Sequence, residues 1–178
     1  MVRYRRNRLE GGKSFFTLTL ADRRSTVLVD QIGALRAAFR ATRQERPFGL
    51  NAVVILPDHL HAILTLPDGD ADFPGRWRRI KGHFSTNLLD AGIEIRRHPN
   101  GELALWQPRY WEHTIRDDND FARHVEYIHF NPVKHGIVKR ARDWPFSSFH
   151  LYVRRGTLPE DWAGEIEEGT FAYGELRS

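Results

Sequence analysis

The stretch FGLNAVVILPDHLHAILTL, residues 48–66, decides the fold. It contains two apolar runs, Phe48–Leu56 and His59–Leu66, separated by the turn-forming residues Pro57 and Asp58. Apolar and β-branched runs of this length around a turn predict two adjacent strands. Side chains two positions apart in a strand share a face, so His59 and His61 point the same way and the intervening Leu60 points to the core.

Working outward, strands are also predicted over Ser14–Leu20 and Tyr110–Ile115, and a hairpin around residues 98–101. Apolar stripes at spacings of three and four predict helices over Ser25–Arg43 and Phe73–Ala91, and a third helix that begins within Asp117–Asp120. We expect Pro132 to interrupt this third helix near Asn131, and any further helical turn to end at Gly136.

The order β-α-β-β-α-β-α predicts an α+β fold, a ferredoxin-like antiparallel sheet with helices on one face. We expect one domain over residues 14–158, a basic arm over residues 1–13 and an acidic tail over residues 159–178. No Gly-rich loop follows a strand, which argues against a nucleotide-binding doubly wound sheet.

Composition narrows the class of protein. The 178 residues include no cysteine, which excludes a disulfide scaffold and a cysteine nucleophile. No apolar run approaches the length of a membrane span, and the basic start lacks the apolar centre of a secretory signal, so we expect a cytoplasmic protein. The net charge is +4, but the last 20 residues hold six acids and one base, so the remainder carries +9. That asymmetry fits a polyanionic partner such as nucleic acid, or a soluble protein rich in arginine.

Two motifs carry the candidate chemistry. The first is His59-Leu60-His61. Its two imidazoles, roughly 6–7 Å apart along a strand, can converge on one divalent metal, or they are two histidines on a polar face. Tyr127 and Asn131 lie four positions apart on one face of the third predicted helix. Tyr127 is either an amphipathic residue at the edge of the core or a nucleophile, with the Asn131 amide as a third metal ligand. A nearby cation would help a phenol of pKa near 10 to ionise.

The pattern His-hydrophobic-His followed by Tyr-x-x-x-Asn-Pro resembles the single-tyrosine HUH transposases, of the IS200-like type, and specifically the REP-associated tyrosine transposases. The resembling stretches are RYRRNRLEGGKSFFTLTLADRR (3–24), AVVILPDHLHAILTLP (52–67), WRRIKGHFS (77–85), WQPRYWEHTIRDDNDFARHVEYIHFNPVKHGIV (106–138) and DWPFSSFHLYVRRG (143–156). Together they cover most of residues 3–156, whereas the acidic tail has no clear counterpart.

The resemblance implies a metal-dependent endonuclease and strand transferase that acts on single-stranded DNA near hairpins of palindromic repeats. His59 and His61 match the metal-binding pair, Tyr127 the nucleophile that forms a 5′-phosphotyrosine, and Asn131 the third ligand, where related transposases have Gln. The implied cofactor is Mg²⁺ or Mn²⁺. Two imidazoles and an amide suit Mn²⁺ better. The resemblance also implies a monomer.

Three groups of basic residues are expected to contact DNA phosphates. A protein that binds DNA in this way is expected to associate with the nucleoid. The basic residues form an N-terminal group, a group on the helix around residue 80 that should project from the sheet, and a group that begins at Lys134: Arg3, Arg5, Arg6 and Arg8; Arg76, Arg78, Arg79 and Lys81; Lys134, Lys139, Arg140 and Arg142. His124, three positions before Tyr127, is a candidate for orienting it.

Two other hypotheses remain open. One is a domesticated relative that binds DNA hairpins without cleaving them. The other is a hydrolytic metallo-phosphoesterase, which fits less well because Ala62-Ile63-Leu64 stands where an Asp-His pair would normally follow.

Overall fold

The computed structural model describes residues 10–164, and its elements follow the predicted order. The strands are β1 (Lys13–Thr19), β2 (Gly49–Ile55), β3 (His59–Thr65) and β4 (Trp111–Thr114). The helices are α1 (Val27–Asp30), α2 (Ile32–Glu45), α3 (Phe73–Asp90), α4 (Asp118–Lys134), the short 3₁₀ helix η1 (Ala141–Asp143) and α5 (Phe149–Arg154).

The four strands form one antiparallel sheet in the order β2-β3-β1-β4. β1 lies between β3 and β4, and its Thr17 pairs with His61 on one side and Trp111 on the other. The predicted α+β antiparallel fold is therefore confirmed. In this order, β1 alone separates β3, which carries His61, from β4, which leads into α4.

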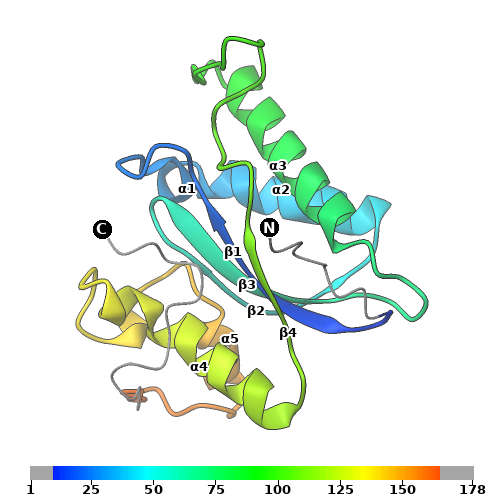
Figure 1. Cartoon of the computed structure of the whole chain (residues 1–178). Helices are drawn as coiled ribbons and strands as arrows, with labels where there is room; N and C mark the ends of the chain where they lie inside the picture. The colour runs from blue at the N-terminus through cyan, green and yellow to red at the C-terminus, as the bar shows by residue number, and fades with distance from the viewer. Residues whose placement is uncertain (1–9, 165–178) are drawn as a thin grey trace, which may run out of the picture.

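The prediction that helices cover one face of the sheet is wrong, because both faces are covered (Figure 1). α2 and α3 pack on one face, where Phe16, Leu60 and Ala62 join the larger core. α4 packs on the other face, against a second core that includes Phe15 and Ile63. Neighbouring residues of β1 and β3 thus point into different cores, as strand alternation requires.

The ends of α4 follow from its sequence. Asp117 caps the first turn, since its side chain accepts a hydrogen bond of 2.8 Å from the Asp120 backbone N–H, as the N-cap preference for Asp predicts. Gly136, at φ +67°, ends the helix as expected. The prediction that Pro132 interrupts the helix is wrong: Pro132 lies inside α4, in its last turn, and the helix continues to Lys134.

Two other details differ from the prediction, and a third agrees with it. The helix expected over residues 25–43 is divided at Gln31 into α1 and α2. The expected hairpin around residues 98–101 is present but short: His98 N–H donates to the Glu102 carbonyl and Ala104 N–H to the Arg96 carbonyl, on either side of a bridge between Arg97 and Leu103. α5 was not predicted, because its six residues are too few to show a period.

Candidate active site

The histidine pair of β3 faces α4. His59 and His61 are 3% and 0% exposed, and their ring centroids lie 5.0 Å apart. Leu60 between them faces the opposite core, as the alternation predicts. The pair therefore lies in the interior between the sheet and α4.

Each imidazole is oriented by a partner at Nδ1. His59 Nδ1 lies 2.7 Å from Asp58 Oδ1, and His61 Nδ1 lies 2.8 Å from Thr17 Oγ1. Burial opposes ionisation of Asp58, but the hydrogen bond and charge of His59 together with Arg23 outweigh it and lower the carboxyl pKa to about 2. An ionised carboxylate can only accept, so His59 Nδ1 carries a proton, and Nε2 is the atom whose lone pair can bind a metal when the imidazole is neutral.

These contacts leave the pair suited to hold a metal. Histidine ligands commonly donate their other N–H to a carboxylate or similar group, which fixes the ring and raises its basicity. His59 Nε2 is buried and has no hydrogen-bond partner among residues 10–164. A buried lone pair of this kind carries an energetic cost unless a ligand satisfies it. The donor set of two imidazoles thus fits a divalent metal such as Mn²⁺.

Tyr127 lies beside this pair. It is 1% exposed, and its ring centroid is 5.2 Å from that of His61 and 5.9 Å from that of Phe15. Lys134 Nζ donates a hydrogen bond of 3.2 Å to the Tyr127 hydroxyl and lies 4.8 Å from the ring centroid. Lys134, predicted to contact phosphate, thus lies at the tyrosine, two helical turns along the same face of α4.

Asn131 lies on the same buried side of α4 and is fully buried. Further along the chain, His135 follows the helix with its ring centroid 5.1 Å from that of His59. Because Tyr127 contacts His61 and His135 contacts His59, α4 runs alongside the histidine pair with Asn131 between the two contacts. The structure thus brings Tyr127 to the histidine pair and places Asn131 on the same buried side of α4.

His124 packs against Phe15, the ring that Tyr127 also contacts, so its role in orienting Tyr127 stays a prediction. Its ring centroid lies 4.9 Å from Phe15, which also packs on Tyr127, and 4.6 Å from His113. His113, Asp120 and His124 form a further group that could hold a metal ion. The sequence analysis missed this group because its members come from β4 and α4 and meet only after the chain folds.

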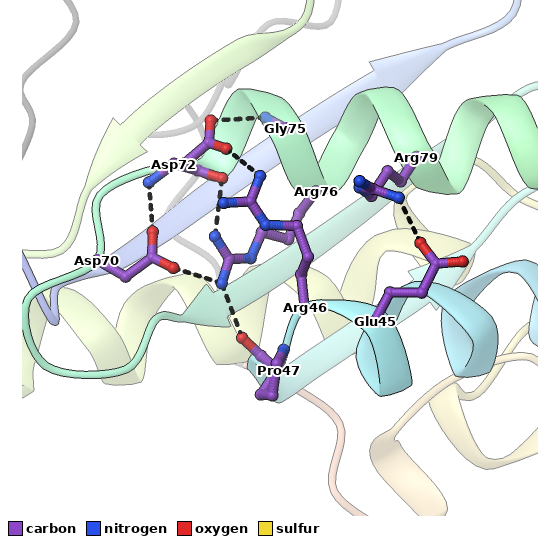
Figure 2. Close-up of polar contacts among 8 residues, drawn as sticks. All are labelled: Glu45, Arg46, Pro47, Asp70, Asp72, Gly75, Arg76 and Arg79. Atoms are coloured by element: carbon purple, nitrogen blue, oxygen red, sulfur yellow. Dashed lines mark hydrogen bonds and ion pairs between the residues drawn. The ribbon is translucent and has the colours of Figure 1, made fainter.

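The basic residues of α3 have differing surroundings (Figure 2). Arg76 is only 2% exposed, and its guanidinium binds Asp70 at 2.6 Å and donates to the Pro47 carbonyl at 3.0 Å. The prediction that Arg76 projects from the sheet is therefore wrong. The acidic residues shortly before it, Asp70 and Asp72, were the available sequence signal. Arg79 pairs with Glu45, and Arg78 is exposed.

Lys81 is partly buried over aromatic rings. Its Nζ donates to the Gln107 carbonyl at 3.3 Å and lies 5.5 Å from the Trp106 ring centroid. Burial lowers the Lys81 pKa to about 8. The predicted N-terminal group, Arg3, Arg5, Arg6 and Arg8, lies outside the described residues 10–164.

An antiparallel sheet that presents a buried histidine pair to a helix-borne tyrosine defines a tyrosine-transposase type of architecture, and comparison with known proteins agrees. The chain is 48% identical over 175 residues, 98% of both chains, to the REP-associated tyrosine transposase of Escherichia coli K12. It is 43% identical over 166 residues to a protein of Haemophilus influenzae named as a putative REP-associated tyrosine transposase, covering 92% of this chain and 94% of that one. No protein-family model matches the sequence.

A solved structure agrees with both relatives. It is described as a REP-associated tyrosine transposase bound to a REP hairpin, and it superposes with a TM-score of 0.87 at 47% identity over 100% of this chain and 99% of that one. The chain therefore belongs to the REP-associated tyrosine transposases. Within residues 10–164, every helix is too short or too polar to cross a membrane.

Proposed function

We propose that this chain is a metal-dependent single-strand DNA nickase and ligase that binds palindromic-repeat hairpins, REP hairpins among them, and forms a 5′-phosphotyrosine at Tyr127. The observation that carries the proposal is the contact between the Tyr127 ring and His61, within a histidine pair whose Nδ1 atoms are both held by neighbouring residues. Hairpin binding is supported by a relative of 47% identity that is described as bound to one.

In the proposed mechanism, His59 and His61 would hold the metal through Nε2, with the Asn131 amide oxygen as third ligand. When bound there, a divalent metal would supply a positive charge that polarises a phosphate oxygen and offsets the charge developing in the transition state. The Tyr127 hydroxyl releases its proton to water and attacks phosphorus, the bond from phosphorus to the 3′-oxygen breaks, and that oxygen takes a proton from water to leave as a 3′-hydroxyl. Lys134 places a positive charge beside the attacking oxygen, 3.2 Å away. The phosphotyrosine bond keeps the free energy of the broken phosphodiester, so the DNA strand can be rejoined without a nucleotide cofactor.

Replacing Tyr127 with Phe tests the nucleophile. The full chain is incubated with a hairpin oligonucleotide and Mn²⁺, and the covalent adduct is counted on a denaturing gel. We expect no adduct with Tyr127→Phe and hairpin affinity within about twofold of wild type, because only a hydroxyl is lost. Tyr152→Phe is the matched control, since that hydroxyl donates to the Asn51 carbonyl on β2, away from the histidine pair, and it should retain the adduct.

An adduct that persists in Tyr127→Phe rules out this nucleophile. A wild-type chain that binds the hairpin but forms no adduct favours the alternative, a domesticated, non-catalytic hairpin-binding protein. Hydrolysis without any adduct favours a phosphoesterase. The assay thus separates the three hypotheses.

We also propose that these basic residues bind phosphate: Arg3, Arg5, Arg6, Arg8, Arg78, Arg79 and Lys81, with Lys134 at the cleavage site. Arg76 leaves this set because it is buried and paired. Each lost phosphate contact flattens the plot of log affinity against log salt by roughly 0.7–0.9. Deleting residues 2–8 should therefore lower the slope for hairpin binding by about two to three units. An unchanged slope would remove the arm from the proposed DNA contacts.

A further inference from the structure

A second group of metal-ligand side chains joins β4 to the start of α4. His113 lies on β4, and Asp120 and His124 lie one turn apart on α4. His113 Nε2 is 2.8 Å from Asp120 Oδ2, and His124 Nδ1 is 3.2 Å from Asp120 Oδ1. The two imidazoles stack nearly in parallel, with centroids 4.6 Å apart and planes 13° apart. Both rings therefore present a nitrogen to the same carboxylate.

The spacing of these atoms suits one small cation. One ligand atom from each of the three residues lies within 4.8 Å of the other two. A tetrahedral cation with ligands at about 2.0–2.2 Å keeps them about 3.3–3.6 Å apart, so relative shifts of about 1.5 Å or less bring the three atoms to that spacing. His124 Nδ1 now donates to the Asp120 carbonyl at 2.7 Å. Binding through that atom requires the imidazole to adopt its other neutral tautomer.

The charges of the group also favour a cation. Burial opposes ionisation of Asp120, but hydrogen bonds from His113 and from the Arg116 backbone N–H outweigh it and lower the carboxyl pKa. Burial lowers the pKa of His124, which keeps this imidazole in the neutral form that ligates metal. The His113 side chain is 19% exposed, so an ion and a water ligand can enter from its side.

We propose that His113, Asp120 and His124 form a second divalent-cation site, for Zn²⁺ or another transition metal, distinct from the site at His59 and His61. Two histidines and one carboxylate are a common set for such ions, with further positions left to water. The apolar Phe15 ring contacts both His61 and His124, at 5.5 and 4.9 Å between centroids, so the two sets belong to different sites. An ion here ties β4 to the helix that carries Tyr127.

The test uses the full chain stripped with a chelator and titrated with Co²⁺ as a spectroscopic probe, with bound metal counted by equilibrium dialysis. We expect two ions for wild type, one for His59→Ala with His61→Ala, one for His113→Gln, and none for the triple variant. The glutamine side chain of His113→Gln keeps a donor for Asp120, and circular dichroism checks the fold. His83→Gln is the matched control, an imidazole paired with the Glu45 carboxylate without a second histidine, and it should retain two ions.

Two outcomes overturn this proposal: no ion bound by the His59→Ala, His61→Ala chain, or an ion count unchanged by His113→Gln in either background. A different outcome bears on the proposed function instead. If wild type binds one ion that survives loss of His59 and His61 but not of His113, the second site stands and the catalytic metal site fails. Adding Zn²⁺ should displace the bound Co²⁺ and remove its absorption in every variant that still binds Co²⁺.

Discussion

His129 makes the stability of the fold depend on pH. Its ring lies in the core between α4 and α5, with centroids 4.7 Å from Tyr152 and 5.8 Å from Phe149. Nε2 lies 2.9 Å from Ser148 Oγ, while Nδ1 is buried and has no hydrogen-bond partner among the described residues. Burial, with a smaller contribution from His150, lowers the His129 pKa to about 3. The folded chain therefore holds this imidazole neutral.

The sign of the effect follows from proton binding. In the unfolded chain a histidine has a pKa of about 6.5, so below that pH the unfolded state binds a proton that the folded state refuses. Stability is fully present above about pH 6.5 and falls as the pH drops toward the folded pKa. At pH 5 the loss from this residue is about 2 kcal/mol, and it changes little for any folded pKa below about 4.

Urea unfolding of wild type and His129→Gln at pH 8 and pH 5 measures this difference. Gln cannot titrate but keeps an amide near Ser148, and both chains carry the same remaining acids and histidines. Wild type should lose about 2 kcal/mol more than the variant between the two pH values. Equal losses in both chains would refute the assignment of the buried neutral imidazole.

The histidine pair and Tyr127 could be predicted from sequence because they depend on local periodicity. Alternation along residues 59–66 places the imidazoles on one face, and helical spacing places Asn131 one turn after Tyr127. Both rules act within a single element. The Asp117 cap was predictable for the same reason, since a cap contacts the next turn of its own helix.

Features that depend on contacts between distant segments were missed. Phe15 and Phe16 are adjacent and both fully buried, so β1 must be covered on two faces, yet alternation alone does not say by which helices. Arg76 is four positions after Asp72, but its burial depends on the Pro47 carbonyl, 29 positions away. His113 meets Asp120 only through the turn between β4 and α4.

Two further predictions test the surroundings of the site and of α3. Asp58→Asn should weaken Mn²⁺ binding about 10–100-fold, measured by calorimetry, because the carboxylate that orients His59 loses its charge. Asp22→Asn, which changes an exposed acid, should leave the affinity unchanged. Equal Mn²⁺ affinities of Asp58→Asn and wild type would show that Asp58 does not support metal binding. Arg76→Met and Arg78→Met distinguish a buried from an exposed arginine on one helix. Arg76 holds Asp70 and the Pro47 carbonyl in the interior, so its loss should cost about 3 kcal/mol of unfolding free energy. Arg78 is exposed, so its loss should change stability by no more than about 0.5 kcal/mol but lower the salt slope of hairpin binding by roughly 0.7–0.9. Chemical unfolding and binding at several salt concentrations measure both quantities on the same proteins. If Arg76→Met left stability intact and lowered the salt slope instead, the buried ion pair of Figure 2 would not be the reason for an arginine at that position.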